Sequence, residues 1–255
     1  MIGAVIGDII GSIYEGNPIK SEDFPLFDDK CRFTDDTVLT VALADSILTG
    51  ESYVLKLREY YRLYPSAGYG SGFRKWASSD SDGPYYSYGN GAAMRISPVG
   101  FAFNDIETVL CMAEKYASVT HNHPDGITGA QAAASSIFLA RSGYGKNEIC
   151  EFIESSFGYD LSRRLDDIRP GYRFDSSCPG SVPESIIAFL ESSGYEDAVR
   201  KAVSMGGDSD TMACIAGGIA QAFYKSVPEK IRSRALGFLD DRLYSIILEF
   251  EEKYM

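Results

Sequence analysis

The sequence predicts an all-α protein. Along most of the 255-residue chain, apolar residues recur at the three- and four-residue spacing that places them on one face of a helix. Segments rich in β-branched and aromatic residues with strict alternation, which would indicate strands, are missing from the sequence. The length is compatible with one compact multi-helix domain over residues 1–255, and we expect that organisation.

The first predicted helix covers residues 2–14, where isoleucines and a valine recur with helical spacing. Gly3, Gly7 and Gly11 stand four residues apart and form a smooth stripe on which another helix can pack closely. Asp8 interrupts the apolar run, and no positively charged segment precedes it. We therefore expect neither a signal peptide nor a membrane span here.

The same periodicity, with start signals such as Ser, Thr and Asp, predicts the remaining helices. They cover residues 36–49, 52–62, 91–97, 105–117, 126–141, 146–156, 183–192, 195–204, 211–224, 228–238 and 240–253. Two stretches, 64–90 and 167–182, break the pattern and contain many Gly, Ser, Tyr and Asp residues. Their aromatic residues predict ordered loops over a site and not flexible linkers.

Composition excludes some classes of protein. The formal net charge of −12 argues against a general nucleic-acid binder, which needs a basic face to displace counterions. The five cysteines are scattered and form no C-x-x-C pair, so a disulfide framework or a zinc site is not expected. Reduced thiols fit a cytoplasmic protein.

Two clusters of acids and threonines each lead into an apolar helix. Either cluster alone would be an ordinary helix start, because the free N–H groups of a first turn favour such residues. Thr34 or a residue near it is expected to cap its helix, with Asp35 and Asp36 in the first turn. Together they predict the halves of one divalent-metal site, since hard cations prefer carboxylate and hydroxyl oxygens. The residues are Thr34, Asp35, Asp36, Asp208, Asp210 and Thr211.

Five motifs resemble those of the ADP-ribosylglycohydrolase family, which includes the dinitrogenase-reductase-activating glycohydrolase and the ADP-ribosyl-acceptor hydrolases. They are IGDIIGSIYE (6–15), TDDT (34–37), YGNGAAMR (88–95), THNHPDG (120–126) and GGDSDTMACIAGGIAQAFY (206–224). No single motif would suffice, but all five occur in the order of the family and span most of the chain. The resemblance implies the same all-α fold.

The resemblance also implies two adjacent divalent ions, Mg²⁺ or Mn²⁺, held by the two acid–threonine clusters. Glu15 matches a catalytic glutamate that lies on a mobile segment beside the metal and the substrate. Without the resemblance, Glu15 would be an exposed acid at a helix end, next to Gly16. Asp8 is expected to orient a neighbouring motif by hydrogen bonding.

A Gly-rich loop before a helix offers free backbone N–H groups to a phosphate, although a G-N-G sequence alone equally describes a turn. The resemblance places Ser87, Gly89, Asn90 and Gly91 against the diphosphate of ADP-ribose and packs Tyr88 against its adenosine part.

The resemblance also brings His121 beside the ribose. Arg95 either reaches a phosphate or braces the metal-loop acids. His123 is expected to be structural and Asp125 to cap the next helix; an H-x-H zinc site would need further ligands.

The implied reaction is hydrolysis of the N- or O-glycosidic bond at C1″ of the distal ribose in an ADP-ribosylated protein or small molecule, with release of ADP-ribose. Water is the expected nucleophile, because divalent ions lower its pKa, and one of Asp36, Asp208 and Asp210 would take its proton. An inactive ADP-ribose-binding module, another dinuclear-metal hydrolase such as a phosphoesterase, and a purely structural role stay open. We expect a monomer without membrane or general nucleic-acid partners.

Overall fold

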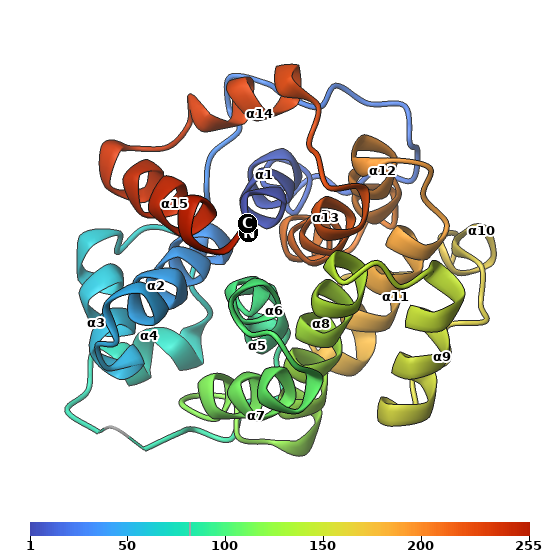
Figure 1. Ribbon diagram of the computed structural model, residues 1–255. Helices are drawn as coiled ribbons and strands as arrows, with labels where there is room; N and C mark the ends of the chain where they lie inside the picture. Colours follow the sequence, from blue (N-terminus) through green and yellow to red (C-terminus); the bar gives the residue numbers. More distant parts are fainter. Residues whose placement is uncertain (82) are drawn as a thin grey trace.

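Helices α1 (Ile2–Gly11) and α13 (Ser209–Tyr224) lie side by side near the centre of the molecule (Figure 1). The computed structural model describes residues 1–81 and 83–255, and within these ranges the structure is helical and has no strand. The predicted all-α fold is confirmed.

The glycine stripe of α1 explains how close this pair is. A Cβ atom on Gly7 would lie 2.0 Å from the carbonyl oxygen of Ala213, and one on Gly11 would lie 2.5 Å from Cα of Asp210. Only glycine allows two helix backbones to approach so closely. The stripe predicted from the four-residue spacing is therefore the contact that fixes the start of α13 against the end of α1.

The other helices surround this pair (Figure 1). They are α2 (Asp35–Thr49), α3 (Tyr53–Leu63), α4 (Ser71–Ala77), α5 (Gly91–Met94), α6 (Ser97–Ala102), α7 (Ile106–Ala117), α8 (Pro124–Arg141), α9 (Lys146–Phe157), α10 (Leu165–Ile168), α11 (Cys178–Leu190), α12 (Tyr195–Ser204), α14 (Glu229–Leu236) and α15 (Asp241–Tyr254). The two chain ends meet, with the amino nitrogen of Met1 3.8 Å from Sδ of Met255.

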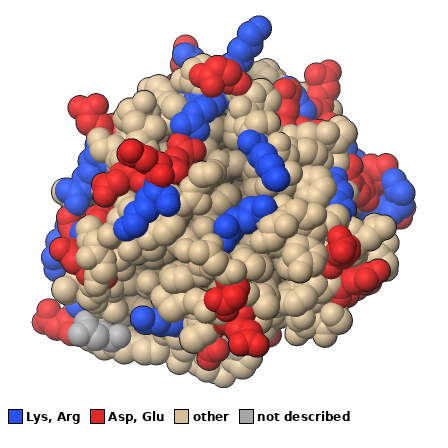
Figure 2. Space-filling view, viewed as in Figure 1, with Lys and Arg blue, Asp and Glu red and all other residues tan. Residues whose placement is uncertain are grey.

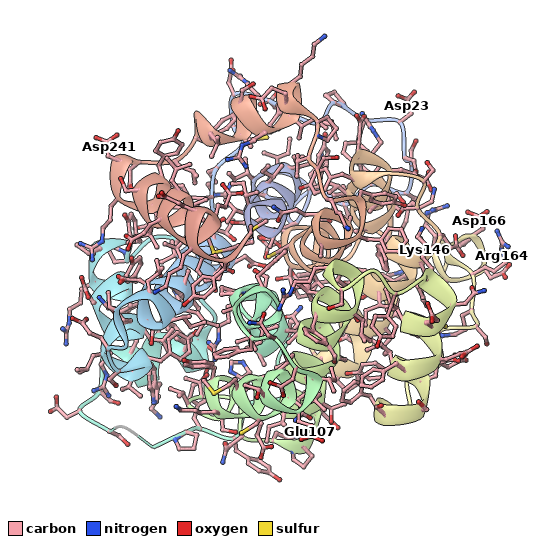
Figure 3. The ribbon with its side chains drawn as sticks, in the orientation of Figure 1. Asp23, Glu107, Lys146, Arg164, Asp166 and Asp241 are labelled. Carbon is pink, nitrogen blue, oxygen red and sulfur yellow. The ribbon has the colours of Figure 1, made fainter. Side chains whose placement is uncertain are left out.

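One apolar core holds these helices together as a single domain. Every residue of α1 is buried, and the central turns of α8 are rich in buried alanine. Many charged side chains lie at the periphery, as the labelled Asp23, Glu107, Arg164 and Asp241 show in Figure 3, whereas a few are buried. On the face drawn in Figure 2, acidic and basic side chains alternate without a continuous basic surface. In the described ranges, every helix is too short or too polar to cross a bilayer.

Several predicted boundaries were wrong. The stretch 64–90, of which residue 82 lies outside the described residues, contains α4. The stretch 167–182 ends early, because α11 begins at Cys178 and not at residue 183. Ser177 caps α11 by accepting a hydrogen bond from the N–H of Gly180 at 3.1 Å, and Pro179 stands in the first turn, where its missing N–H costs nothing.

Candidate functional site

A cavity of about 340 Å³ opens where the N-terminal ends of α2, α5 and α13 converge with the segment that follows α1. Loops before α4 and α11 complete its wall. Of the thirteen residues predicted to form the site, only Tyr88 is outside this lining; it is exposed, with its ring 5.5 Å from the ring of His123. The others line the cavity: Glu15, Thr34, Asp35, Asp36, Ser87, Gly89, Asn90, Gly91, His121, Asp208, Asp210 and Thr211.

Asp8 fixes the first acid–threonine cluster in place. Its buried carboxylate accepts hydrogen bonds from the N–H of Thr34 at 2.9 Å, from the Thr34 hydroxyl at 2.7 Å, and from the N–H of Thr37 at 3.1 Å. The hydroxyl of Thr37 donates a fourth. One side chain of α1 thereby orients the turn that opens α2, as the sequence led us to expect.

A threonine of the second cluster contacts an acid of the first. Thr34 caps α2 by accepting a hydrogen bond from the N–H of Asp36 at 3.3 Å, so the predicted cap is confirmed. Thr211, in the first turn of α13, donates from its hydroxyl to Oδ2 of Asp36 at 3.3 Å. Residues that are 175 positions apart in the chain thus share one wall of the cavity.

The acids form two overlapping groups. Carboxylate oxygens of Asp8, Asp36 and Asp210 lie within 4.8 Å of one another, and so do those of Glu15, Asp208 and Asp210. Oδ1 of Asp36 is buried and has no hydrogen-bond partner among residues 1–81 and 83–255. An unpartnered carboxylate oxygen among other carboxylates is a good fit for a hard divalent cation, which accepts an all-oxygen donor set.

Burial and mutual repulsion raise the pKa values of these acids. Burial, and then the charges of Asp8 and Asp35, raise the pKa of Asp36 well above its usual range. Burial and the charge of Asp36 likewise raise the pKa of Asp210 well above its usual range. Burial and the charge of Asp8 raise the pKa of Asp35 to about 7. So many adjacent carboxylates resist simultaneous ionisation, and a bound cation would relieve that repulsion.

The glycine-rich loop is tied directly to the second acidic cluster. Nδ2 of Asn90 donates to Oδ2 of Asp208 at 2.8 Å, and the N–H of Asn90 donates to the carbonyl of Ser176 at 2.8 Å. Gly91 begins α5 and faces a histidine: a Cβ at this position would lie 3.2 Å from Nε2 of His121. The loop therefore lies between the acids and His121.

Arg95 is buried and contacts the histidine motif. Its Nη2 donates to the Thr120 hydroxyl and lies 3.4 Å from Nδ1 of His121. In the described ranges Arg95 makes no hydrogen bond to the metal-loop acids. Its contacts therefore do not support the expectation that it braces those acids. Burial, and then the charge of Arg95, lower the pKa of His121 well below its usual value, so His121 is neutral.

The cap of α8 is His123 and not Asp125, so His123 has the structural role expected of it. Nδ1 of His123 accepts a hydrogen bond from the N–H of Asp125 at 3.1 Å, so His123 caps α8 and Asp125 stands in the first turn. The expectation that Asp125 is the cap was wrong by two residues, because Pro124 takes the first helical position that its fixed φ suits.

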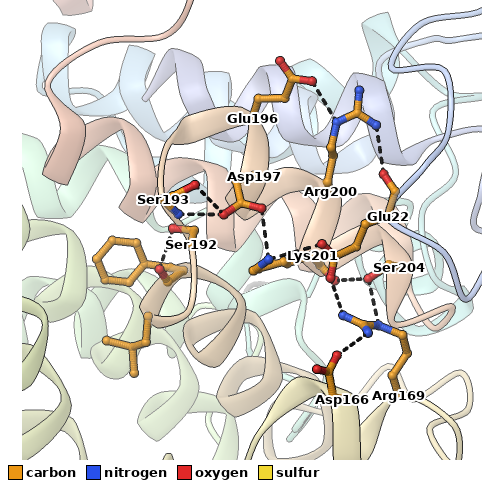
Figure 4. A network of polar contacts seen from close by, with 12 residues as sticks. Glu22, Asp166, Arg169, Ser192, Ser193, Glu196, Asp197, Arg200, Lys201 and Ser204 are labelled. Carbon is orange, nitrogen blue, oxygen red and sulfur yellow. Dashed lines mark hydrogen bonds and ion pairs between the residues drawn. The ribbon is translucent and has the colours of Figure 1, made fainter.

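Glu15 is at the mouth of the cavity, on the segment between α1 and α2. Burial and the charge of Asp208 raise the pKa of Glu15, and the charge of Arg32 opposes them. Further along the segment, Glu22 pairs with Arg169 at 2.6 Å and with Lys201 at 3.2 Å (Figure 4). This network anchors the segment to α12 and to the end of α10.

The site also contains residues that the motifs did not indicate. They include Arg32, Gly68, Ser71, Phe73, Tyr85 and Ser176. Most of them come from the stretches 64–90 and 167–182, which the sequence predicted to lie over a site without showing which residues would face it. Arg32 precedes the TDDT motif by two residues, and this proximity was the one available signal.

Comparison with known proteins identifies the family. The ADP-ribosylglycohydrolase family model matches residues 1–254. The chain is 27% identical to the ADP-ribosylhydrolase ARH3 of Mus musculus, over 93% of this chain and 86% of that protein. It is 25% identical to ARH3 of Homo sapiens, over 93% and 88%.

Two further similarities support this. The ADP-ribosylarginine hydrolase Tri1 of Pseudomonas putida (strain GB-1) is 24% identical over 88% of this chain and 69% of its own length. A solved structure described as an ADP-ribosylglycohydrolase-related protein complex shares the fold, with a TM-score of 0.73, 24% identity, and coverage of 99% of this chain and 95% of its own. The chain belongs to the ADP-ribosylglycohydrolase family and is an enzyme of the glycohydrolase type.

Proposed function

We propose that this protein hydrolyses the glycosidic bond at C1″ of ADP-ribose in ADP-ribosylated proteins or small-molecule conjugates and releases ADP-ribose. One observation carries the proposal. The two acid–threonine clusters and the glycine-rich loop open onto the same cavity and are joined by the hydrogen bond from Asn90 to Asp208. A phosphate-binding loop fixed to a metal-binding acid suits a substrate that joins a diphosphate to a ribose.

The acids and threonines of the two clusters would hold two divalent cations, Mg²⁺ or Mn²⁺. The unpartnered Oδ1 of Asp36 and the all-oxygen donor set support this assignment. When bound, such ions lower the pKa of water and stabilise developing negative charge. Asp8 is not assigned as a ligand, because both of its oxygens already accept hydrogen bonds.

The remaining residues would position the substrate. Backbone N–H groups from Gly89 to Gly91, with Ser87, would face the diphosphate, and His121 would face the distal ribose. Tyr88, exposed outside the cavity, would pack against an adenosine that extends past the rim.

The reacting bond would lie between Glu15 and the buried acids. Asp36, Asp208 or Asp210 would take a proton from the attacking water, and Glu15 would act beside the leaving group, in a reaction with an oxocarbenium-like transition state. A cytoplasmic location and a monomeric state stay predictions.

The decisive assay is release of ADP-ribose from a panel of arginine-, serine- and cysteine-linked ADP-ribosylated substrates, with Mg²⁺ or Mn²⁺ present. We expect turnover of at least one linkage. Tight ADP-ribose binding without turnover of any linkage would instead identify a binding module. Hydrolysis of phosphate esters without ADP-ribose affinity would identify a phosphoesterase.

A further inference from the structure

His121 has an unusually well-defined hydrogen-bonding environment on one side of its ring. Nδ1 lies 2.7 Å from the Thr120 hydroxyl and 3.4 Å from Nη2 of Arg95. An arginine can only donate, so Nδ1 is not protonated there. The Thr120 hydroxyl already accepts from Arg95, and its own hydrogen is therefore free to donate to Nδ1.

The other ring nitrogen points to the glycine-rich loop. Nε2 would lie 3.2 Å from a Cβ on Gly91 and 3.6 Å from a Cβ on Gly89. Both positions are glycine, and both line the cavity together with His121. The space that two side chains would occupy is thus left open in front of Nε2.

We propose that Arg95 and Thr120 are positioning residues that hold His121 as the neutral tautomer protonated on Nε2. The cavity then presents a fixed, uncharged N–H donor beside the backbone of the glycine-rich loop. Its complement is an oxygen acceptor on the ligand, either a ribose hydroxyl or a phosphate oxygen. That ligand assignment rests on the proposed function; the tautomer does not.

The charges around the ring support a neutral donor. Arg95, at the C-terminal end of α5, is the charged group that faces the imidazole, and the ring of Tyr85 from the preceding loop lies 5.9 Å away. Arg95 is itself 1% exposed, and its guanidinium lies 5.8 Å from the ring of Tyr53. A second positive charge on His121 would be repelled by this buried cation.

The tautomer can be observed directly, because His121 and His123 are the only two histidines of the chain. Long-range ¹H–¹⁵N correlation spectra of the uniformly labelled protein distinguish a protonated from an unprotonated ring nitrogen, and His123→Ala assigns the signals. We expect Nε2 of His121 to be protonated and Nδ1 to be bare at neutral pH. A wild-type spectrum with the proton on Nδ1, or with a charged ring, would refute the proposal whether or not the protein is an enzyme.

Variants of Thr120 test the positioning role. Thr120→Val keeps the shape but removes the donor, so the spectrum should change to a mixture of tautomers; Thr120→Ser should restore the wild-type pattern. If Thr120→Val folds, as its thermal melt will show, and keeps the pure Nε2–H tautomer, Thr120 has no positioning role. If Thr120→Val does not fold, Thr120→Ala, which also removes the hydroxyl, takes its place in the same measurement, and a pure Nε2–H tautomer in that variant would refute the positioning role.

Titration of the same variants identifies the acceptor oxygen. We expect Thr120→Val to bind ADP-ribose about fivefold more weakly than wild type, which corresponds to one hydrogen bond. ADP, which lacks the distal ribose, should bind equally to both proteins if the acceptor is a ribose hydroxyl, and should lose affinity in parallel if it is a phosphate oxygen. Unchanged affinity for both ligands would show that the N–H group contacts neither.

Discussion

At the scale of single residues, the buried acids carry the chemistry. The carboxylates of Asp36, Asp208 and Asp210 are held in a small volume by hydrogen bonds from Thr211 and Asn90, yet Oδ1 of Asp36 stays without a partner. Most buried polar side-chain atoms have a hydrogen-bond partner, so an unpartnered oxygen among several carboxylates needs an explanation. A bound cation would give this oxygen a partner and neutralise the adjacent carboxylates.

Replacing these acids should therefore abolish activity without unfolding the protein. We expect Asp36→Asn, Asp208→Asn and Asp210→Asn each to lower turnover by at least about 100-fold, since each loses a charged ligand. Thermal melts should stay cooperative, because fewer adjacent carboxylates repel one another. Asp166→Asn, a change of an exposed acid that only pairs with Arg169, is the control. Near-normal turnover in all three variants would remove these acids from the mechanism.

Gly91 is the residue at which the loop and the histidine come closest. A side chain there would press against Nε2 of His121 and against the approach to the backbone N–H groups. We expect Gly91→Val to weaken ADP-ribose binding by more than tenfold and to leave metal binding unchanged, as isothermal titration would measure. Gly194→Val, at a position with open space around it, is the matched control. Equal ADP-ribose affinity in Gly91→Val and wild type would mean that the loop is only a turn.

At the scale of elements, the packing of α1 on α13 connects the fold to the site. The glycines at both ends of α1 contact the backbone or side chains of α13, but only Gly11 touches the turn that carries Asp210. The hydrogen bonds from Thr34 and Thr37 to Asp8 add the start of α2 to the same assembly. One short helix thereby fixes the starts of both α13 and α2.

This packing predicts different consequences at the two ends of the stripe. A Cβ on Gly3 would lie 2.5 Å from the carbonyl of Gly217, and one on Gly11 would lie 2.4 Å from the carbonyl of Ser209. We expect Gly3→Ala and Gly11→Ala each to reduce the free energy of unfolding by about 1–3 kcal/mol, as expected for an overpacked contact.

Only the Gly11→Ala variant should also weaken metal binding, because only its new methyl group displaces Asp210. Chemical denaturation and metal titration on the two folded variants separate the effects. Equal metal affinities would show that the closeness of α1 and α13 serves stability alone.

At the scale of the whole molecule, the acidic site makes stability depend on pH. Burial raises the pKa of Asp35 from 3.8 to about 7, and the pKa values of Asp36 and Asp210 also rise. A raised pKa in the folded state contributes stability below the unfolded pKa, and that contribution is lost as the pH rises through the folded value. The lowered pKa values of His121 and of the buried amino group of Met1 act in the opposite direction, as the pH approaches their usual values of 6.5 and 8.0.

In the presence of a chelator, we therefore expect the melting temperature of the wild type, measured relative to that of Asp35→Asn, to fall as the pH rises from about 4 to about 7. His121 and the amino group of Met1 are present in both proteins, so their contributions cancel in this comparison. Added Mg²⁺ or Mn²⁺ should reverse the fall, since a cation favours the ionised acids. A relative melting temperature that rises with pH under chelation would contradict the direction assigned to the pKa of Asp35.

Sequence and structure agree most where a local pattern determines the outcome. The glycine spacing in α1, the cap at Thr34 and the convergence of the two acidic clusters could all be predicted, because spacing and side-chain chemistry decide them. The sequence did not predict that α11 starts at Cys178 or that His123 acts as a cap. Proline and glycine residues at these places indicate a loop and the start of a helix equally well.

The contacts of Arg95 also lay beyond the sequence. Thr120 and Arg95 are 25 residues apart, and only the packing of α5 against α8 brings them together. Tertiary packing also brings Arg32, Tyr85 and Ser176 into the wall of the cavity. A loop can be predicted to lie over a site, but tertiary packing decides which of its residues face inward.

The central claim is that the acid–threonine clusters hold the cations on which glycosidic hydrolysis depends. The most direct test is one preparation, stripped of metal and then titrated with Mg²⁺ or Mn²⁺, in which bound metal is measured by elemental analysis and ADP-ribose release is measured on the substrate panel. Activity should be absent in the stripped protein and should return as two ions bind per chain. Full turnover with no metal detectable by elemental analysis would contradict the account.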